Sequence, residues 1–593
     1  MRRFALTFLV LWIALGAAAA QSPAKQTKLE GFDSFVEEVL KEWQVPGLAI
    51  AVVEDGKLIH SKGYGTRNID KGLPATPNTL FAIGSITKSF TALSLGILAE
   101  EGKLDWDKPV RDYLPGFRLH DPLASERITP RDLVTHRSGL PRHDAVWYGS
   151  PFTRKEMMVR LRYLEPSKDF RSTWQYNNLM FMAAGMLAGH LADVTWEQHV
   201  RQTILIPLGM ANSNFSVLES QKRDDFALPY AREKEQILEL PFRNIDQIGP
   251  AGSINSNVEE MARYLLLHLN KGKHGGKQIV AESQIQQMHS PQMVIPGQGQ
   301  YTEVGHGSYG MGWMINTYRG HKQVAHGGGI DGFAALVSFL PEQKQGSVIL
   351  TNRGGNPLPM ILSYNIFDRL LGLEPVNWRQ RIGEQEKKAR TAEEESKKKG
   401  LTTRRMGTKP SHDLKEYAGE FEHPAYGAFK IEVEKEDLKL AFNGRSTPLV
   451  HHHYDIFEIP EQPLQPFPKL KLTFLTDVKG DIASLTVPLE LNVKEIVFTR
   501  MPEKALSDRR LLESLVGQYE LAGRTSTVAL RADGALNLTV PGQPTYELVP
   551  AKNLWFNIKG LTGFSVEFKK DPSGAVTDAI FHQPNGSFAA HRK

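Results

Sequence analysis

The chain of 593 residues contains no cysteine. Disulfide staples and a lipid attached to a cysteine are therefore excluded, so the fold depends on packing alone. Basic residues are scattered along the chain rather than gathered in a stripe, and the net charge is only +5. A weak, dispersed charge gives no reason to expect nucleic-acid binding.

Long apolar runs are also missing. The N-terminal sequence "MRRFALTFLVLWIALGAAAAQ" has two arginines, an apolar run from Phe4 to Leu15, and small residues up to Ala20. Because this run is shorter than the ~20 residues that span a bilayer, it predicts a cleavable secretory signal over 1–20. No later segment reaches that length. We therefore expect a periplasmic or secreted protein without stable membrane insertion, with Gln21 as the first mature residue.

Strand patterns lie at both ends of residues 21–375. The sequence "GLAIAVVEDGKLIHSKGYG" alternates apolar and polar residues around Asp55 and Gly56, which predicts a hairpin. Far downstream, "HKQVAHGGGIDGFAALVSFLPEQKQGSVILTNRGG" predicts three more strands, and the segment between the two regions is mostly helical in pattern. We expect one sheet assembled from both ends, with a helical region inserted.

The remaining chain divides into three parts. Residues 376–410 are highly charged, which predicts a solvated linker, helical or disordered, with a docking segment as the alternative. Residues 411–502 and 508–593 have strand patterns that correspond, since "YAGEFEH" in the first matches "LVGQYEL" in the second. Two small antiparallel barrels or curved sheets are predicted.

A run of three histidines, His451 to His453, lies in the first β module. Three adjacent imidazoles on a strand cannot all face one ion, so a surface or interface loop is favoured over metal binding. We predict no metal site and no cofactor.

Ser85 and Lys88 lie three positions apart in "FAIGSITKSFT", where an extended segment meets a predicted helix. A serine in that place often only caps the helix. A serine hydroxyl needs a base to become a nucleophile, however, and a buried lysine one turn on can act as that base or hold a proton-transfer network. The pair therefore requires further evidence.

Further evidence comes from two more motifs. The first is a Y-x-N tripeptide, Tyr176 to Asn178, in "TWQYNN", and the second is His326, Gly327 and Gly328 in "AHGGGIDG". S-x-x-K, Y-x-N and a basic-x-Gly element, in this order, resemble the penicillin-recognising serine hydrolases, in the branch of class C β-lactamases and D-alanyl-D-alanine peptidases. The resemblance covers Leu29 to about Leu373. It implies an α/β β-lactamase/transpeptidase-like domain, and the two β modules resemble the lipocalin-like barrels of D-aminopeptidases, which border the active site.

The resemblance implies a role for each of these residues. Ser85 is the acylated nucleophile, Lys88 and Tyr176 share the acid and base work, and Asn178 holds the substrate carbonyl or the lysine. The backbone amides of Ser85 and Gly329 form the oxyanion hole, next to Gly327 and Gly328. We further expect a positive Lys88 to favour the phenolate of Tyr176.

One motif departs from the family pattern. Where β-lactamases have Lys-Thr-Gly or Lys-Ser-Gly to hold a carboxylate, this chain has His326 and Gly327. A mostly neutral imidazole is a weak carboxylate clamp. We therefore predict a serine hydrolase that acts on a small peptide, of aminopeptidase or D-peptidase type. A carboxylesterase, a β-lactamase and a non-catalytic binding protein remain the alternatives, and the sequence does not indicate an oligomeric state.

Overall fold

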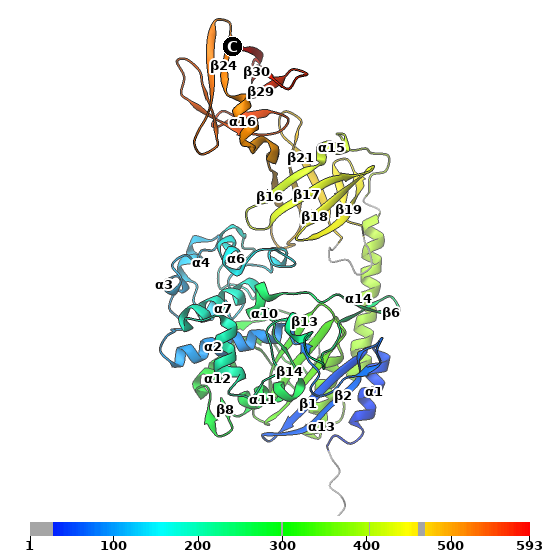
Figure 1. The fold of residues 1–593 in the computed structure, drawn as a ribbon. Coiled ribbons are helices and arrows are strands. Elements are labelled where there is room, and N and C mark those ends of the chain that lie inside the picture. Colours follow the sequence, from blue (N-terminus) through cyan, green and yellow to red (C-terminus); the bar gives the residue numbers. More distant parts are fainter. Residues whose placement is uncertain (1–27, 298–300, 402–403, 461–468) are drawn as a thin grey trace, which may run out of the picture.

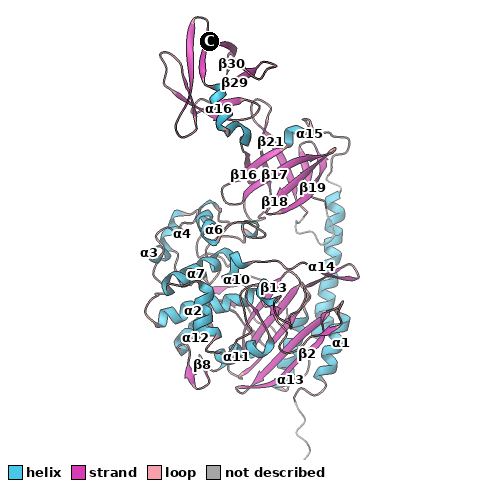
Figure 2. Ribbon diagram, in the orientation of Figure 1, coloured by secondary structure: helices cyan, strands magenta, loops and turns pink. Residues whose placement is uncertain are grey.

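The computed structural model describes residues 28–297, 301–401, 404–460 and 469–593 (Figure 1). The predicted signal over 1–20 lies outside the described residues. The described chain forms a sheet-and-helix domain, a long helix and two closed β barrels, arranged in that order along the molecule (Figures 1 and 2). The predicted fold class is confirmed.

The first domain is built on a nine-stranded sheet that both ends of the domain supply. Its strands, in spatial order, are β10 (Met293–Val294), β11 (Ser308–Tyr309), β12 (Met314–Tyr318), β13 (His321–Ile330), β14 (Phe333–Leu340), β15 (Gln345–Thr351), β1 (Gly47–Glu54), β2 (Lys57–Asn68) and β3 (Leu73–Pro74). The β1–β2 hairpin turns at Asp55 and Gly56, both with positive φ, as predicted.

Helices cover both faces of this sheet, which is why β1 is apolar from Gly47 to Val53. Leu48 and Ile50 point to the core formed with α1 (Phe32–Glu42) and α13 (Leu358–Leu371), whereas Ala49 points to the core of the inserted helices. The other helices of the domain are α2 (Thr87–Glu100), α3 (Val110–Tyr113), α4 (Pro122–Arg127), α5 (Pro130–Leu133), α6 (Arg154–Arg160), α7 (Asn178–Ala192), α8 (Trp196–Val200), α9 (Val217–Ser220), α10 (Gly249–Gly252), α11 (Val258–Leu269) and α12 (Glu282–Met288). Smaller two-stranded sheets are formed by β4 (Phe81–Ala82) with β7 (Asn255–Ser256), β5 (Tyr230–Glu233) with β6 (Gln236–Glu239), and β8 (Lys273–His274) with β9 (Lys277–Gln278).

Within the described chain no single helix is long and apolar enough to cross a membrane. One bent pair, α7 with the helical segment Trp196–Leu205, passes such a test together by length and composition.

The charged segment after the sheet domain is the 24-residue helix α14 (Trp378–Leu401). Trp378 and Ile382 at its start are buried in the core against α1 and α13. At 1.5 Å per residue the helix spans about 36 Å, and Figure 1 shows it running alone along one side of the molecule toward the first barrel.

The two barrels repeat one plan. Barrel 1 consists of β16 (Gly419–His423), β17 (Gly427–Glu434), β18 (Asp437–Phe442), β19 (Arg445–His453), β20 (Ile456–Glu458), β21 (Lys471–Thr476), β22 (Ile482–Val487) and β23 (Ile496–Arg500), preceded by α15 (Leu414–Tyr417). Barrel 2 consists of β24 (Gly517–Leu521), β25 (Arg524–Leu530), β26 (Leu536–Thr539), β27 (Tyr546–Pro550), β28 (Trp555–Ile558), β29 (Ser565–Lys570), β30 (Val576–Gln583) and β31 (Gly586–Arg592), preceded by α16 (Arg509–Leu515). In each, an arginine of the last strand, Arg500 or Arg592, donates to carbonyl groups just before the first strand.

The barrels differ in how they attach to the rest. The buried side chains of barrel 1 belong to one continuous apolar core with the inserted helices of the sheet domain, whereas those of barrel 2 form a core of their own. Barrel 1 is therefore a structural part of the first domain.

The histidine run belongs to strand β19, so the expectation of a loop is wrong. A β-bulge between His451 and His453 interrupts the alternation of the strand, so His452 is buried while His451 and His453 are half-buried. Among the described residues, no group of His, Asp and Glu side chains is arranged to hold a metal ion.

Candidate active site

Ser85 lies in a 3₁₀ turn, Gly84–Ile86, that leads directly into α2. Gly84 has a φ of +51°, and a Cβ there would lie 2.8 Å from the backbone nitrogen of Gly329, so only glycine fits. Within residues 81–90, all of which are described, Ser85 is the one residue that is not buried. The turn thus presents the Ser85 hydroxyl beside β13.

Lys88 is fully buried, one turn into α2. Its Nζ donates to Asn178 Oδ1 at 2.7 Å and to the carbonyl oxygen of Ala251 at 2.8 Å, and lies 3.1 Å from Ser85 Oγ. Burial lowers the pKa of Lys88 well below its usual value, and the Arg142 cation acts in the same direction. A neutral amine has two N–H donors and one lone pair, so it matches two carbonyl acceptors and one hydroxyl donor.

Asn178 and Tyr176 approach this amine from the start of α7. The side-chain Nδ2 of Asn178 donates to Asp144 Oδ1 at 3.0 Å, which fixes Oδ1 toward Lys88. Asn178 was expected to hold either the substrate carbonyl or the lysine, and in this structure it holds the lysine. The ring of Tyr176 lies 4.7 Å from Lys88 Nζ.

The expectation that Tyr176 is a phenolate is wrong for the site without a substrate. Burial raises the pKa of Tyr176 above its usual value, and a hydrogen bond with Ser85 opposes this only in part. Since the Lys88 pKa is lowered, both groups favour their neutral forms. Lys88 is then the proton acceptor, and the phenol of Tyr176 is a donor.

His326 is buried behind the site rather than open to a substrate. Its Nδ1 lies 2.7 Å from the carbonyl oxygen of Gly327, which can only accept, so its Nε2 accepts the hydroxyl proton of Tyr309 at 2.9 Å. Burial lowers the pKa of His326 to about 3, and the Lys88 charge acts in the same direction. The imidazole is therefore neutral, as its position in the sequence predicted.

The glycines after His326 form a strand edge beside Ser85. Strand β12 pairs with β13 only as far as Ala325, whereas β14 pairs with β13 through Ile330. A Cβ at Gly328 would overlap the carbonyl oxygen of Ile83, so its lack of a side chain lets the strand approach the Ser85 turn. Gly329 is exposed at this edge.

Sequence reasoning missed a charged pair at the site. Arg142 donates from Nε to Asp144 at 2.6 Å, and its guanidinium lies 5.1 Å from the centre of the Tyr176 ring. Trp147 Nε1 donates to the same Asp144 carboxylate at 2.6 Å. The only signal was that "RHDAVW" lies within the range from Leu29 to about Leu373 that resembles the family.

This arrangement can perform acyl transfer. The neutral amine can take the proton of Ser85, the start of α2 favours the developing anion, and the exposed Gly329 amide lies at hand to hold a carbonyl oxygen. The fold and site therefore define a serine hydrolase.

Comparison with known proteins places the chain within this class. Residues 32–370 match the family model described as Beta-lactamase, so the chain belongs to the β-lactamase family. Residues 403–500, which contain barrel 1, match a domain of unknown function.

Individual relatives are distant. The chain is 28% identical to unguisins hydrolase ungD′ of Aspergillus campestris over 69% of this chain and 78% of the relative. It is 26% identical to protein flp of Staphylococcus aureus over 56% of this chain and 64% of flp. Among solved structures, an octameric penicillin-binding protein homologue from Pyrococcus abyssi matches with a TM-score of 0.52, at 26% identity, over 79% of this chain and all of that chain.

Proposed function

We propose that the protein is a secreted peptidase that works through an acyl ester on Ser85. The free edge of β13 at Gly327–Gly329 carries this proposal, because an extended peptide can pair its backbone with an unpaired strand edge. An ester substrate offers fewer N–H groups for such pairing. The similarity to a relative named unguisins hydrolase supports a hydrolytic role.

The chemical steps follow from the contacts of Lys88. Ser85 Oγ attacks the substrate carbonyl as its proton passes to Lys88 Nζ, and the backbone amides of Ser85 and Gly329 hold the oxyanion, each worth ~3 kcal/mol. The C–N bond then breaks, and the leaving amine takes the proton through the hydroxyl of Tyr176. Water attacks the ester with Lys88 again as base, which releases the acid and restores Ser85.

The neutral His326 favours substrates without a carboxylate next to the reacting bond. A charge-assisted contact to a carboxylate is typically worth ~1.5–3 kcal/mol, and a buried neutral imidazole with both nitrogens occupied cannot supply it. Penicillins are therefore expected to be poor substrates. A carboxylesterase is the second candidate, because the same acylation step serves esters.

Two experiments test this function. A fluorophosphonate probe followed by mass spectrometry should place its adduct on Ser85 and give none in Ser85→Ala. Peptide p-nitroanilides, p-nitrophenyl esters and nitrocefin are then compared by kcat/KM. Amide turnover with slow nitrocefin turnover supports the peptidase, esters without amides support the esterase, and an adduct that persists in Ser85→Ala refutes the nucleophile.

A further inference from the structure

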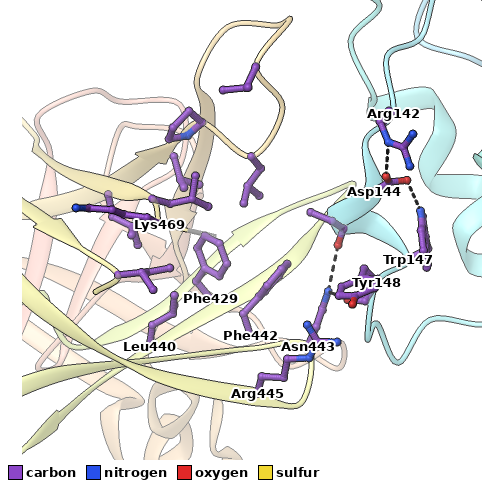
Figure 3. Close-up of a pocket in the computed structure, with 18 of the residues that line it drawn as sticks. Arg142, Asp144, Trp147, Tyr148, Phe429, Leu440, Phe442, Asn443, Arg445 and Lys469 are labelled. Atoms are coloured by element: carbon purple, nitrogen blue, oxygen red, sulfur yellow. Dashed lines mark hydrogen bonds and ion pairs between the residues drawn. The ribbon is translucent and has the colours of Figure 1, made fainter. Parts of the chain in front are cut away.

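A cavity of about 720 Å³ lies where barrel 1 meets the sheet domain. Figure 3 shows Phe429, Leu440 and Phe442 on its barrel side and Arg142, Asp144, Trp147 and Tyr148 on the other side. The volume lies within the range of ~300–1,000 Å³ typical of ligand pockets. The cavity therefore joins the interior of a barrel to the region of the active site.

The barrel side of this cavity is apolar and belongs to the barrel interior. On β17 and β18 the inward-facing side chains alternate with exposed or half-buried ones such as Lys430 and Lys439. The interior residues that line the cavity are Phe429, Leu440, Phe442, Ile459, Leu472 and Val487. Deeper in the barrel, Phe429 stacks on Phe498, and Phe421 and Phe457 pack against Phe474, so side chains fill the interior and the cavity lies at its mouth.

The other end of the cavity reaches Gly329, beside the turn that carries Ser85, although Ser85 itself is not among its described lining residues. Gly329 lines it, and the Gly329 backbone nitrogen lies within 2.8 Å of the place where a Cβ on Gly84, the neighbour of Ser85, would stand. Asp144, which holds Asn178, lines it as well. A substrate carbonyl at Ser85 is therefore adjacent to the entrance of the barrel.

Direct bonds hold the barrel mouth at this place. Asn443 Nδ2 donates to the carbonyl oxygens of Ala145 at 3.1 Å and Tyr148 at 3.3 Å. His143, next to Arg142 and Asp144 in the chain, lies 2.6 Å from the hydroxyl of Tyr426 in barrel 1 through its Nδ1. The loop that carries the active-site charges is thus bonded on both sides to the barrel.

Apart from Lys469, the charged groups of the described lining lie at the junction between the barrel and the sheet domain. Asp144 pairs with Arg142, and Asp331 pairs with Arg243 while it accepts from Tyr148 at 2.6 Å. The barrel adds Asn443 and Arg445 at the junction and the exposed Lys469, whereas the fully buried side chains that it contributes to the described lining are all apolar. The chemistry of this space selects an apolar group.

We propose that the cavity at the mouth of the barrel 1 lumen binds the apolar part of the acyl group that is transferred to Ser85. The proposal deepens the peptidase function above and rests on it. The acyl group stays attached to the protein between the two steps, so a pocket beside Ser85 can hold it through both, whereas the leaving group must escape to solvent. Substrates with a long aliphatic or aromatic acyl substituent are therefore preferred to small ones.

The chain length of the acyl group gives a direct test on the unmodified protein. With p-nitrophenol as the constant leaving group, kcat/KM is measured for acetate, butyrate and hexanoate esters. Because each of the four additional methylenes contributes about a fourfold gain when buried, we expect a rise of roughly 200-fold from acetate to hexanoate. A flat series with clear acetate turnover overturns the proposal but leaves the serine hydrolase intact.

Two matched variants locate the preference. Leu440→Trp fills the lumen of barrel 1 from its third strand, and Leu538→Trp places the same bulk on the third strand of barrel 2, at an equally buried position. We expect Leu440→Trp to flatten the series while acetate turnover stays within a few-fold, and Leu538→Trp to leave the series unchanged. A folded Leu440→Trp protein with the original preference overturns the proposal.

A binding measurement separates this inference from catalysis. Fluorescence of 11-(dansylamino)undecanoic acid is titrated against Ser85→Ala, which cannot form the ester. Binding that Leu440→Trp abolishes and Leu538→Trp retains supports the lumen site even if the proposed peptidase activity fails. The absence of binding to Ser85→Ala overturns it.

Discussion

Asp144 and Arg142 should shift the pH dependence of the enzyme in opposite directions. Only a neutral Lys88 can accept the Ser85 proton, so the acid limb of kcat/KM follows the pKa of Lys88. The Arg142 cation lowers this pKa and the Asp144 carboxylate raises it. Asp144→Asn should therefore shift the acid limb to lower pH, and Arg142→Gln should shift it to higher pH.

The size of the shift follows from the bridge that Asn178 makes. Its Oδ1 lies 2.7 Å from Lys88 Nζ and its Nδ2 lies 3.0 Å from Asp144 Oδ1. The carboxylate is thus within about 8 Å of the amine, and at an effective dielectric constant of about 20 the pair interacts by about 2 kcal/mol. Solvent screens both charges, because the side chains of Arg142 and Asp144 are 53% and 30% exposed. We therefore expect a shift of about one pH unit, or about tenfold in kcat/KM on the limb.

The assay is kcat/KM for one p-nitrophenyl ester from about pH 5 to 10. Asp144→Asn retains the Oδ1 atom that accepts from both Trp147 and Asn178, so the geometry of the site is largely kept. Asp331→Asn is the control, since Asp331 lines the same cavity but pairs with Arg243. If Asp144→Asn and Arg142→Gln shift the acid limb in the same direction, or if neither shifts it, a neutral Lys88 is refuted as the base.

Three further predictions follow from the site and the N-terminus. Tyr176→Phe should lower kcat by ~100-fold with folding intact, because the leaving group loses its proton donor; a loss of only a few-fold would show that Lys88 delivers the proton without it. Gly84→Ala should lower the melting temperature and reduce kcat/KM by more than ~10-fold, because alanine at φ +51° costs ~1–2 kcal/mol and its Cβ would crowd Gly329. Gly96→Ala in α2, where a Cβ has ordinary contacts at 3.5 Å, should be neutral or stabilising, and equal effects of the two changes would contradict the reasoning. The mass of the mature protein should correspond to a chain that begins at Gln21, and retention of residues 1–20 would exclude signal cleavage.

The fold of the first domain was predictable because its signals are local. The hairpin at Asp55 and Gly56 needs positive φ at both positions, and the buried strand β1 is apolar as far as Val53. The corresponding segments of the two β modules indicated a duplication, and the structure has two closed barrels in these places. For the charged segment the sequence left helix and disorder open, since solvated helices and disordered chains share this composition.

The chemistry of the site was predictable in its residues but not in its charges. Spacing brings Ser85 and Lys88 to one helix face, but the neutrality of Lys88 depends on burial and on Arg142, which no spacing reveals. Tyr176 is buried as well, and this burial raises its pKa, whereas a charged Lys88 was expected to lower it. Pairwise charge reasoning fails here because desolvation outweighs the neighbouring charge.

The role of the barrels could be predicted only in part from the sequence. The sequence suggested only that both modules border the active site. In the structure barrel 1 shares its core with the sheet domain, so a chain ending near Glu384 would expose that apolar surface. Long-range contacts such as His143 with Tyr426 carry no local sequence signal.

The separate core of barrel 2 has a consequence for how the molecule melts. Residues that share one packed core tend to unfold in one cooperative transition, whereas a body with its own core unfolds independently. The sheet domain and barrel 1 should therefore melt together, and barrel 2 should give a second, smaller heat-absorption peak. A bound acyl analogue on Ser85 would raise the temperature of the first peak and leave the second in place. The chain then has three folded bodies but two thermodynamic units.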